Sequence, residues 1–263
     1  LTTIFCQIDD FCKQLDDYTR GMLLTGPMKS QRGPAASLSI SEIMTILTMF
    51  QMTRFRDFKN FYKGYLLSFC HSAFPTLPTY ERFVALMGRS IFPMTLFVQM
   101  NSGKKTGIYY IDSTSLPVCE LKRSRRHKTF DSIAEYGKTS VGWFFGLKLH
   151  IVISDKSELI AFKITKGNKH DAKEAENLLS PLNGLAFGDK GYLGKKLFET
   201  LFERGLKLIT RKRKNMKTKE TNSPFEKQLL NQRNIIETVI GHLKYCYHVW
   251  HTRHRSVLNA MTQ

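Results

Sequence analysis

The sequence predicts a chain in two parts: a helical region over residues 1–100, then an α/β domain (α+β, with a mixed sheet) over residues 101–263. Two observations lead to this prediction. Apolar residues recur at helical spacing in the first part, whereas short apolar runs alternate with amphipathic stretches from residue 108 onward. The pattern changes at "NSGKKTG", residues 101–107, and we place the domain boundary there.

Two helices of the first part have clear start signals. In "SLSISEIMTILTMF" the apolar residues share one helical face, and Ser39 with Glu42 has capping-box spacing. In "LPTYERFVALMGRS" Pro78 and Thr79 stand at the start and Gly88 near the end. Between them, "RFRDFKNFYKGYLLSFCHSAF" mixes basic and aromatic residues, and we expect its aromatic side chains to pack in the core. Its basic residues are expected to contact a phosphate backbone, and these are Arg54, Arg56, Lys59 and Lys63.

The second part reads in the order strand, hairpin, helix, strand, helix, strand, helix. Strands are predicted at residues 108–112, 142–153, 159–165, 184–187 and 206–210. Helices are predicted at residues 171–182, 195–205 and 225–250, the first with Asp171 as its N-cap. A basic loop, residues 211–224, precedes the last helix.

Composition indicates a polyanionic partner. Lys plus Arg number 40 against 22 Asp plus Glu, a formal net charge of +18. An anionic membrane surface is the competing partner, but we find no basic amphipathic anchor and no apolar run long enough to span a bilayer. Five scattered cysteines indicate reduced thiols in a cytosol, and no signal-peptide pattern is present. The chain begins without Met and stops without a helix-ending signal, so we expect one or both ends to be missing.

Three acidic residues have unusual positions. Asp112 closes "IYYID", Asp189 closes "GLAFGD", and Glu237 lies inside the apolar "NIIETVI". Each has an ordinary explanation. An Asp at a strand end is commonly a cap or turn residue, and Glu237 can form an ion pair with Arg233, four residues before it on one helix face.

Taken together, these three acids suggest a metal site. Ends of neighbouring strands meet at one edge of a sheet, and a helix packed on the sheet can bring Glu237 beside Asp112 and Asp189. Carboxylates with no His or Cys partner suit Mg²⁺ or Mn²⁺. In a strongly basic protein, a pair of such ions suits phosphodiester chemistry.

The words around these acids resemble the DDE transposases of bacterial insertion sequences. The motifs are "IYYIDSTSLPVC", "FGDKGYLGKKLF" and "NQRNIIETVIGHLK", with an Arg four residues before the Glu and a Lys seven after. The intervening "RHKTF", "GKTSVGWFFGLKLH", "KGNKHD", "LITRKRKNMK" and "HTRHRS" look like insertion sequence family 982. The similarity is strongest from about residue 108 to 256. Members of that family usually continue beyond the point where this chain ends.

The resemblance implies a ribonuclease-H-like catalytic core preceded by a helical DNA-binding region. It implies Asp112, Asp189 and Glu237 as catalytic residues and as ligands of Mg²⁺, with Mn²⁺ as a substitute. DNA, both element ends and target, is the implied partner, bound by a homodimer in the cytoplasm at the nucleoid. Basic residues around the acids are expected to bind this DNA, and they are Arg123, Arg125, Arg126, Lys128, Lys190, Arg211, Lys212, Arg213, Lys214, Arg233 and Lys244.

Other interpretations stay open. A zinc site from the stretch "CYHVWHTRH" has the wrong spacings for a finger. We expect Arg253, His254 and Arg255 instead to contact DNA phosphates or to stabilise the active-site end of the last helix. His170 and Asp171 either lie behind the metals or are loop and cap residues. Tyr192 suggests a tyrosine recombinase, but its surroundings do not support one. The chain is therefore predicted to be a metal-dependent DNA transposase; the alternatives are a ribonuclease-H-type nuclease without joining activity and a truncated inactive DNA-binding relative.

Overall fold

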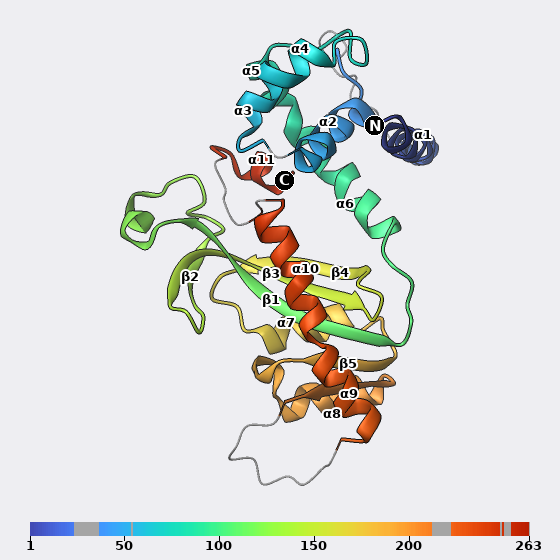
Figure 1. Cartoon of the computed structure of the whole chain (residues 1–263), viewed down its shortest axis with the longest axis vertical. Helices are drawn as coiled ribbons and strands as arrows, with labels where there is room; N and C mark the ends of the chain where they lie inside the picture. Colours follow the sequence, from blue (N-terminus) through green and yellow to red (C-terminus); the bar gives the residue numbers. More distant parts are fainter. Residues whose placement is uncertain (24–36, 54, 212–221, 248, 250–253, 263) are drawn as a thin grey trace. The chain divides into compact units, whose positions relative to one another are not determined.

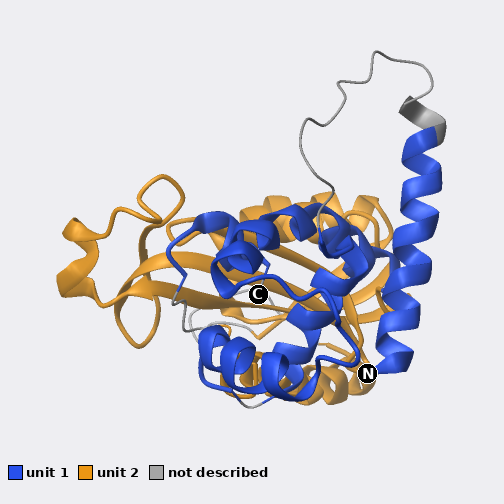
Figure 2. Cartoon of the chain, turned by 90° about the horizontal axis from the view of Figure 1, so that it is seen from above, with its two compact units in different colours: residues 1–101, 253–263 blue, residues 102–252 orange. Residues whose placement is uncertain are grey.

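The chain divides into two compact units (Figure 2). Unit 1 comprises Leu1–Asn101 and Arg253–Gln263, and unit 2 comprises Ser102–Thr252. The computed structural model describes residues 1–23, 37–53, 55–211, 222–247, 249 and 254–262. The assignment of DNA binding to residues 1–100 and catalysis to residues 101–263 stays a prediction.

Unit 1 is helical over its described residues. Its elements are α1 (Thr2–Leu23), α2 (Ile40–Met52), α3 (Phe58–Asn60), η1 (Phe61–Leu66), α4 (Leu67–Phe69), α5 (Tyr80–Met87), η2 (Gly88–Ser90), α6 (Ile91–Met100) and α11 (Val257–Met261). The predicted starts are confirmed, because Ser39 and Glu42 form a reciprocal capping box and the Thr79 side chain caps α5. The aromatic residues between α2 and α5 form the core, with Phe61 and Tyr62 fully buried, as predicted.

The basic residues of the same stretch lie outside that core. Arg56, Lys59 and Lys63 are exposed, and Lys63 lies 3.5 Å from Glu81. Arg54 lies outside the described residues. An exposed cation is available to a phosphate, so their predicted role as phosphate contacts remains open to test.

One described helical stretch, Tyr80–Met100, is long and apolar enough to cross a membrane by length and composition. The expectation that no such run exists therefore needs correction. Phe83, Leu86 and Met87 of this stretch are buried in the helical core. Core helices pass the same test of length and composition, so the stretch is weak evidence for a membrane span.

Unit 2 is built on a six-stranded mixed sheet (Figure 1). Its strands are β1 (Ile108–Cys119), β2 (Glu135–Lys138), β3 (Trp143–Ser154), β4 (Leu159–Lys166), β5 (Gly184–Gly188) and β6 (Leu206–Thr210). Its helices are η3 (Leu121–Arg126), α7 (Asp171–Leu179), η4 (Lys190–Tyr192), α8 (Lys195–Glu203), α9 (Pro224–Gln232) and α10 (Asn234–Tyr245). β3 is antiparallel to both of its neighbours β1 and β4, whereas β5 and β6 run parallel to β1. The predicted fold class, an α/β domain with a mixed sheet that follows a helical region, is confirmed.

Helices cover both faces of the sheet because side chains of β1 alternate between them. Tyr109 and Ile111 pack in a core with α7 and α8. Tyr110 packs on the opposite face, in a core with α9 and α10. Figure 1 shows α10 crossing the sheet. The residues that follow Ile111 in β1 therefore face α10 and α7 in turn.

Two predicted elements have different limits in the structure, and one strand was not predicted. β1 continues seven residues past Asp112, to Cys119, because it pairs with β3 along that length. β2 was not predicted, and it pairs with the start of β3. The predicted helix 225–250 is two helices, α9 and α10, which join at Arg233.

Candidate active site

The acidic residues lie where the parallel pairing of β1 and β5 ends. The last registered pair is Tyr110 with Phe187. Asp112 and Asp189 each follow two residues later, on β1 and just after β5. The prediction that Asp112 lies at a strand end is therefore wrong. Asp112 lies within β1, at the end of the pairing between β1 and β5. This arrangement still places both carboxylates at one edge of the β1–β5 pair.

Asp112 is a largely buried carboxylate held by two donors. The Ser113 backbone N–H donates to its Oδ1 at 2.8 Å, and Arg233 Nη2 donates to its Oδ2 at 2.8 Å. Burial raises the pKa of the Asp112 carboxyl above its ordinary value, and the Asp189 charge adds to this; Arg233 and the Ser113 amide act against it.

Arg233 joins Asp112 to Glu237. While its Nη2 donates to Asp112, its Nη1 donates to Glu237 Oε1 at 3.1 Å. The Arg233 side chain is only 11% exposed, and its buried Nε has no hydrogen-bond partner among the described residues. The predicted ion pair between Arg233 and Glu237 is therefore present, and Arg233 also brings Asp112, 121 residues away in sequence, to the same guanidinium.

Glu237 has a more open environment than its sequence suggests. Its side chain is 56% exposed, although Ile236 and Ile240 beside it are buried. The helix directs these apolar neighbours into the core and Glu237 away from it, since adjacent helical residues point in different directions. The expectation of a carboxylate among apolar side chains is wrong, and an exposed carboxylate beside Arg233 is accessible to a ligand from solvent.

Asp189 is a turn residue as well as a member of the acidic group. It is the N-cap of η4, and its Oδ1 accepts a hydrogen bond from the Gly191 N–H at 2.7 Å. A side chain at position 191 would lie 2.9 Å from that oxygen and 3.6 Å from Asp171 Oδ2. The absence of a side chain at Gly191 thus leaves room between the Asp189 and Asp171 carboxylates.

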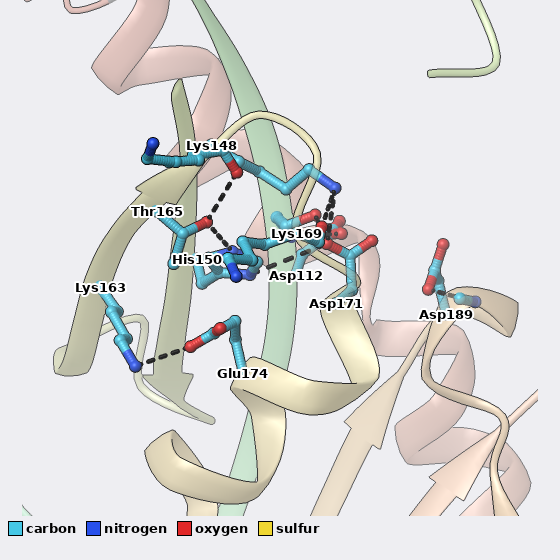
Figure 3. Close-up of polar contacts among 12 residues, drawn as sticks. Asp112, Lys148, His150, Lys163, Thr165, Lys169, Asp171, Glu174 and Asp189 are labelled. Atoms are coloured by element: carbon cyan, nitrogen blue, oxygen red, sulfur yellow. Dashed lines mark hydrogen bonds and ion pairs between the residues drawn. The ribbon is translucent and has the colours of Figure 1, made fainter. Parts of the chain in front are cut away.

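Asp171 is the centre of a polar network on the α7 face (Figure 3). Its Oδ1 accepts from Ser113 Oγ at 2.9 Å and from Lys148 Nζ at 3.1 Å. The His150 ring nitrogen Nδ1 lies 3.8 Å from the same oxygen, while its Nε2 hydrogen bonds to Thr165 at 2.9 Å. The prediction that Asp171 is the N-cap of α7 is wrong, because His170 holds that position and Asp171 is the first helical residue. Its carboxylate instead fixes the residue next to Asp112.

Lys148, Ser113 and Arg233 were not all visible as one group in the sequence. Sequence spacing revealed Arg233 as a partner of Glu237, but nothing local indicated that it also contacts Asp112. Lys148 and Ser113 meet Asp171 because the strand register places Ser113 opposite His150 and Ser115 opposite Lys148. One signal for Lys148 is present in the sequence: it is a basic residue inside the apolar strand 142–153, and a buried charge needs a partner.

Tyr192 lies beneath this acidic group. Its side chain is fully buried, and burial raises the pKa of its hydroxyl well above the ordinary value, with Asp171, Asp112 and Asp189 adding to the effect. The Ser113 hydroxyl donates to Asp171, and the Tyr192 hydroxyl has no hydrogen-bond partner among the described residues. A buried phenol with a raised pKa is a poor nucleophile, which agrees with rejecting a tyrosine recombinase.

The acidic group suits a hard divalent cation by its chemistry. Its donors are carboxylate oxygens, which Mg²⁺ and Mn²⁺ prefer. Among the residues that the structure describes, no three Asp, Glu, His or Cys side chains are already arranged as a metal site. The Arg233 guanidinium instead supplies the positive charge between Asp112 and Glu237. The residues therefore fit such an ion, which would bind the Asp112 and Glu237 carboxylates beside Arg233 or in place of it.

The transposase DDE domain matches residues 102–257, more than half of the chain. The chain belongs to this family. No curated protein matches it.

Transposases are among the solved structures to which the chain is similar. It covers 52% of a piggyBac transposase chain, in a synaptic complex with hairpin DNA, using 84% of its own length, at 13% identity and a TM-score of 0.43. It covers 74% of a Mos1 transposase chain, in a paired-end complex with the left transposon end, using 89% of its own length, at 10% identity and a TM-score of 0.29. The chain thus spans about half the length of the piggyBac transposase chain.

The basic residues of this DDE domain fall into two groups. One group lies close to the acids: Arg233 contacts two of them, Lys190 directly follows Asp189 and is exposed, and Lys244 lies on α10. Burial lowers the pKa of the Lys244 ammonium, while the Asp112 charge acts to raise it, so Lys244 also lies near Asp112. The second group is exposed on and around η3, and it consists of Arg123, Arg125, Arg126 and Lys128.

The remaining predicted DNA contacts are only partly described. Arg211 is exposed directly after β6, and Lys212, Arg213 and Lys214 lie outside the described residues. For the zinc alternative, Cys246 is exposed, while His248 and His251 lie outside the described residues. Arg253 is likewise outside them, and His254 and Arg255 belong to the part of the chain that clusters with unit 1.

Proposed function

We propose that this DDE-domain protein is a metal-dependent DNA transposase of insertion sequence family 982 that cleaves and joins DNA at the ends of its element. The single observation that supports this best is the Arg233 guanidinium, which holds Asp112 and Glu237 together at the edge where Asp189 also lies. A cluster of carboxylates of this kind, on a chain with a formal net charge of +18, suits phosphodiester chemistry.

Asp112, Asp189 and Glu237 would hold two Mg²⁺ ions, with Mn²⁺ as a substitute. When bound, such ions activate an attacking oxygen and stabilise the leaving oxygen of a phosphodiester. Water is the first attacking group, at the element end, and the freed 3′-hydroxyl is the second, on target DNA. Asp112 is held in place for this role by the Ser113 amide and by Arg233.

The basic residues near the acids would position the DNA. Arg233 orients the Asp112 and Glu237 carboxylates, and Lys190 and Lys244 contact phosphates next to the scissile bond. Both chemical steps are phosphoryl transfers, in which positioning and charge neutralisation provide most of the catalysis. No covalent protein intermediate is required, and the buried Tyr192 hydroxyl is unsuited to forming one.

Partner and location follow from the same proposal. The partners are the terminal inverted repeats of the element and a target DNA, bound by a homodimer in the cytoplasm at the nucleoid. Residues 1–100 form the helical DNA-binding region, and residues 101–263 form the catalytic domain. The exposed Arg56, Lys59 and Lys63 of the first region support DNA contact there.

Strand transfer in vitro tests the proposal. The purified chain is incubated with Mg²⁺ and the DNA ends that flank its own gene, and both cleaved and joined products are measured. We expect both products with wild-type protein and neither with Asp112→Asn or after chelation. Cleavage without joining would favour a ribonuclease-H-type nuclease, and binding without cleavage would favour an inactive DNA-binding relative.

A further inference from the structure

The turn between β2 and β3 presents an apolar side chain at its tip. Thr139 and Gly142 exchange backbone hydrogen bonds of 2.8 and 3.3 Å, so Ser140 and Val141 form a tight two-residue turn. Val141 is β-branched and 97% exposed, and its backbone N–H donates to Thr139 Oγ1 at 3.3 Å. The hairpin therefore presents an apolar side chain to solvent at its tip.

Exposed aromatic residues lie beside this tip. Trp143 is 59% exposed at the start of β3, and Tyr136 on β2 is 44% exposed. Lys138 pairs with Trp143 across the hairpin, and its ammonium lies 5.6 Å from the centre of the indole ring. An exposed indole with a cation beside it presents an apolar surface and a positive charge in one place.

The arginines of η3 add charge to the same end of the sheet. Tyr136 Oη hydrogen bonds to Ser124 Oγ at 2.6 Å, and this contact attaches η3 to the hairpin. Arg123, Arg125 and Arg126 are exposed, and none lies within ion-pair distance of a carboxylate among the residues described. Figure 1 shows the segment that contains η3 and the β2 hairpin extending together at one end of the sheet. The result is an aromatic surface bordered by unneutralised cations.

We propose that this hairpin surface, formed by residues 136–143 and η3, binds an unpaired stretch of DNA, with a base stacked on Trp143 and phosphates on the η3 arginines. Aromatic side chains and cations side by side are the features that recognise single strands, whose bases expose their ring faces. A fully paired duplex hides those faces, and its phosphates need only the cations. The choice of DNA as the partner rests on the proposed function.

The strand geometry limits where this contact falls. Asp112 pairs with Ile151, and Trp143 lies eight residues from Ile151 along β3. At the usual rise per strand residue, Trp143 lies about 27 Å from Ile151 along β3, and Asp112 lies one strand spacing, about 5 Å, to the side of Ile151. This length equals about eight nucleotides at the 3.4 Å spacing of duplex DNA. An unpaired stretch near the scissile phosphate can therefore reach the hairpin surface.

Tryptophan fluorescence tests the proposal directly. The chain has two tryptophans, so Trp250→Phe leaves Trp143 as the single reporter. This protein is titrated with an oligo-dT of about twelve nucleotides, without metal and at low salt. We expect saturable quenching, and we expect Trp143→Ala to weaken oligo-dT binding roughly five- to hundredfold while Trp143→Phe retains most of it.

A matched control and a catalytic readout separate the outcomes. Phe202, on α8, is 70% exposed and serves as the control, because Phe202→Ala also removes an exposed aromatic ring from unit 2. Equal oligo-dT affinity of Trp143→Ala and Phe202→Ala, or quenching by anionic lipid vesicles but not by oligo-dT, would overturn the hairpin proposal. If wild-type protein cleaves element ends but shows no such quenching, only this proposal fails. Saturable quenching without cleavage would instead leave it standing and remove the transposase function.

Discussion

Arg233 donates to Asp112 at 2.8 Å from a guanidinium that is almost fully buried. The same guanidinium also donates to Glu237. Removal of the Arg233 side chain therefore leaves the largely buried Asp112 carboxylate without its cation. For Arg233→Ala we expect a loss of about 1.5–3 kcal/mol in the free energy of unfolding, the range for a hydrogen bond to a charged group. An exposed ion pair would instead contribute only a few tenths of a kcal/mol.

Catalysis should respond to Arg233 more strongly than folding does. Arg233→Lys keeps the charge but loses the planar fork that reaches two carboxylates. We therefore expect Arg233→Lys to be nearly as stable as wild type in urea unfolding and yet to cleave DNA far more slowly. Equal loss of activity and of folded protein in both variants would show that Arg233 is structural only.

The role of the three acids is tested by replacing each carboxylate with the neutral amide of the same shape. Each of Asp112→Asn, Asp189→Asn and Glu237→Gln should abolish cleavage and joining while DNA binding stays nearly intact, because the amide keeps the shape and loses the charge that holds a metal. Glu199→Gln, an exposed acid on α8, is the control and should keep full activity. Mg²⁺ should raise the Tm of wild type and not that of Asp112→Asn. A variant that transposes near the wild-type frequency would exclude that residue as a ligand.

The pattern of the sequence was sufficient for the order of most elements of unit 2, β2 excepted, but not for the contacts between them. The hairpin 142–153 and 159–165 could be read because apolar runs flank a polar turn. The length of β1 could not, since Pro117 and the polar residues after Asp112 resemble a loop, and pairing with β3 alone keeps them extended. The contact of Arg233 with Asp112 depends on how α10 packs on β1, which no local spacing encodes.

Asp171 and Glu174 provide a matched pair on α7. Both are N-terminal acids paired with a lysine of the sheet, Lys148 at 3.1 Å and Lys163 at 2.6 Å, but only Asp171 contacts Ser113 beside Asp112. We expect Asp171→Asn and Glu174→Gln to destabilise the fold to a similar extent, by about 1–3 kcal/mol. Cleavage should fall by at least tenfold more in Asp171→Asn. Equal activities, measured under conditions in which both variants are folded, would mean that Asp171 only anchors α7.

His150 should make stability depend on pH. Burial is the main cause that lowers the pKa of its imidazole below 6.5, and Lys148 adds to it, while Asp171 opposes it. Below about pH 6.5, His150 therefore binds a proton more readily in the unfolded chain than in the folded chain. The free energy of unfolding accordingly decreases as the pH falls below about 6.5. His150→Gln should flatten this part of the curve of unfolding free energy against pH. His242→Gln, at an exposed position on α10, should leave it unchanged.

The basic residues 211–214, which the sequence predicts to lie in a loop, offer a test of DNA binding that does not depend on catalysis. Each phosphate contact releases counterions, so log affinity should fall with log salt by about 0.9 per contact on duplex DNA. Replacing Lys212, Arg213 and Lys214 together by Ala should reduce that slope by a few units and weaken binding at low salt.

The matched triple replacement is Arg123, Arg125 and Arg126 to Ala, which removes the same charge from η3. The loop variant should lose more affinity for paired DNA, and the η3 variant should lose more for oligo-dT, because the two cation groups then serve different forms of DNA. Identical slopes for wild type and both variants would place the DNA-binding surface elsewhere.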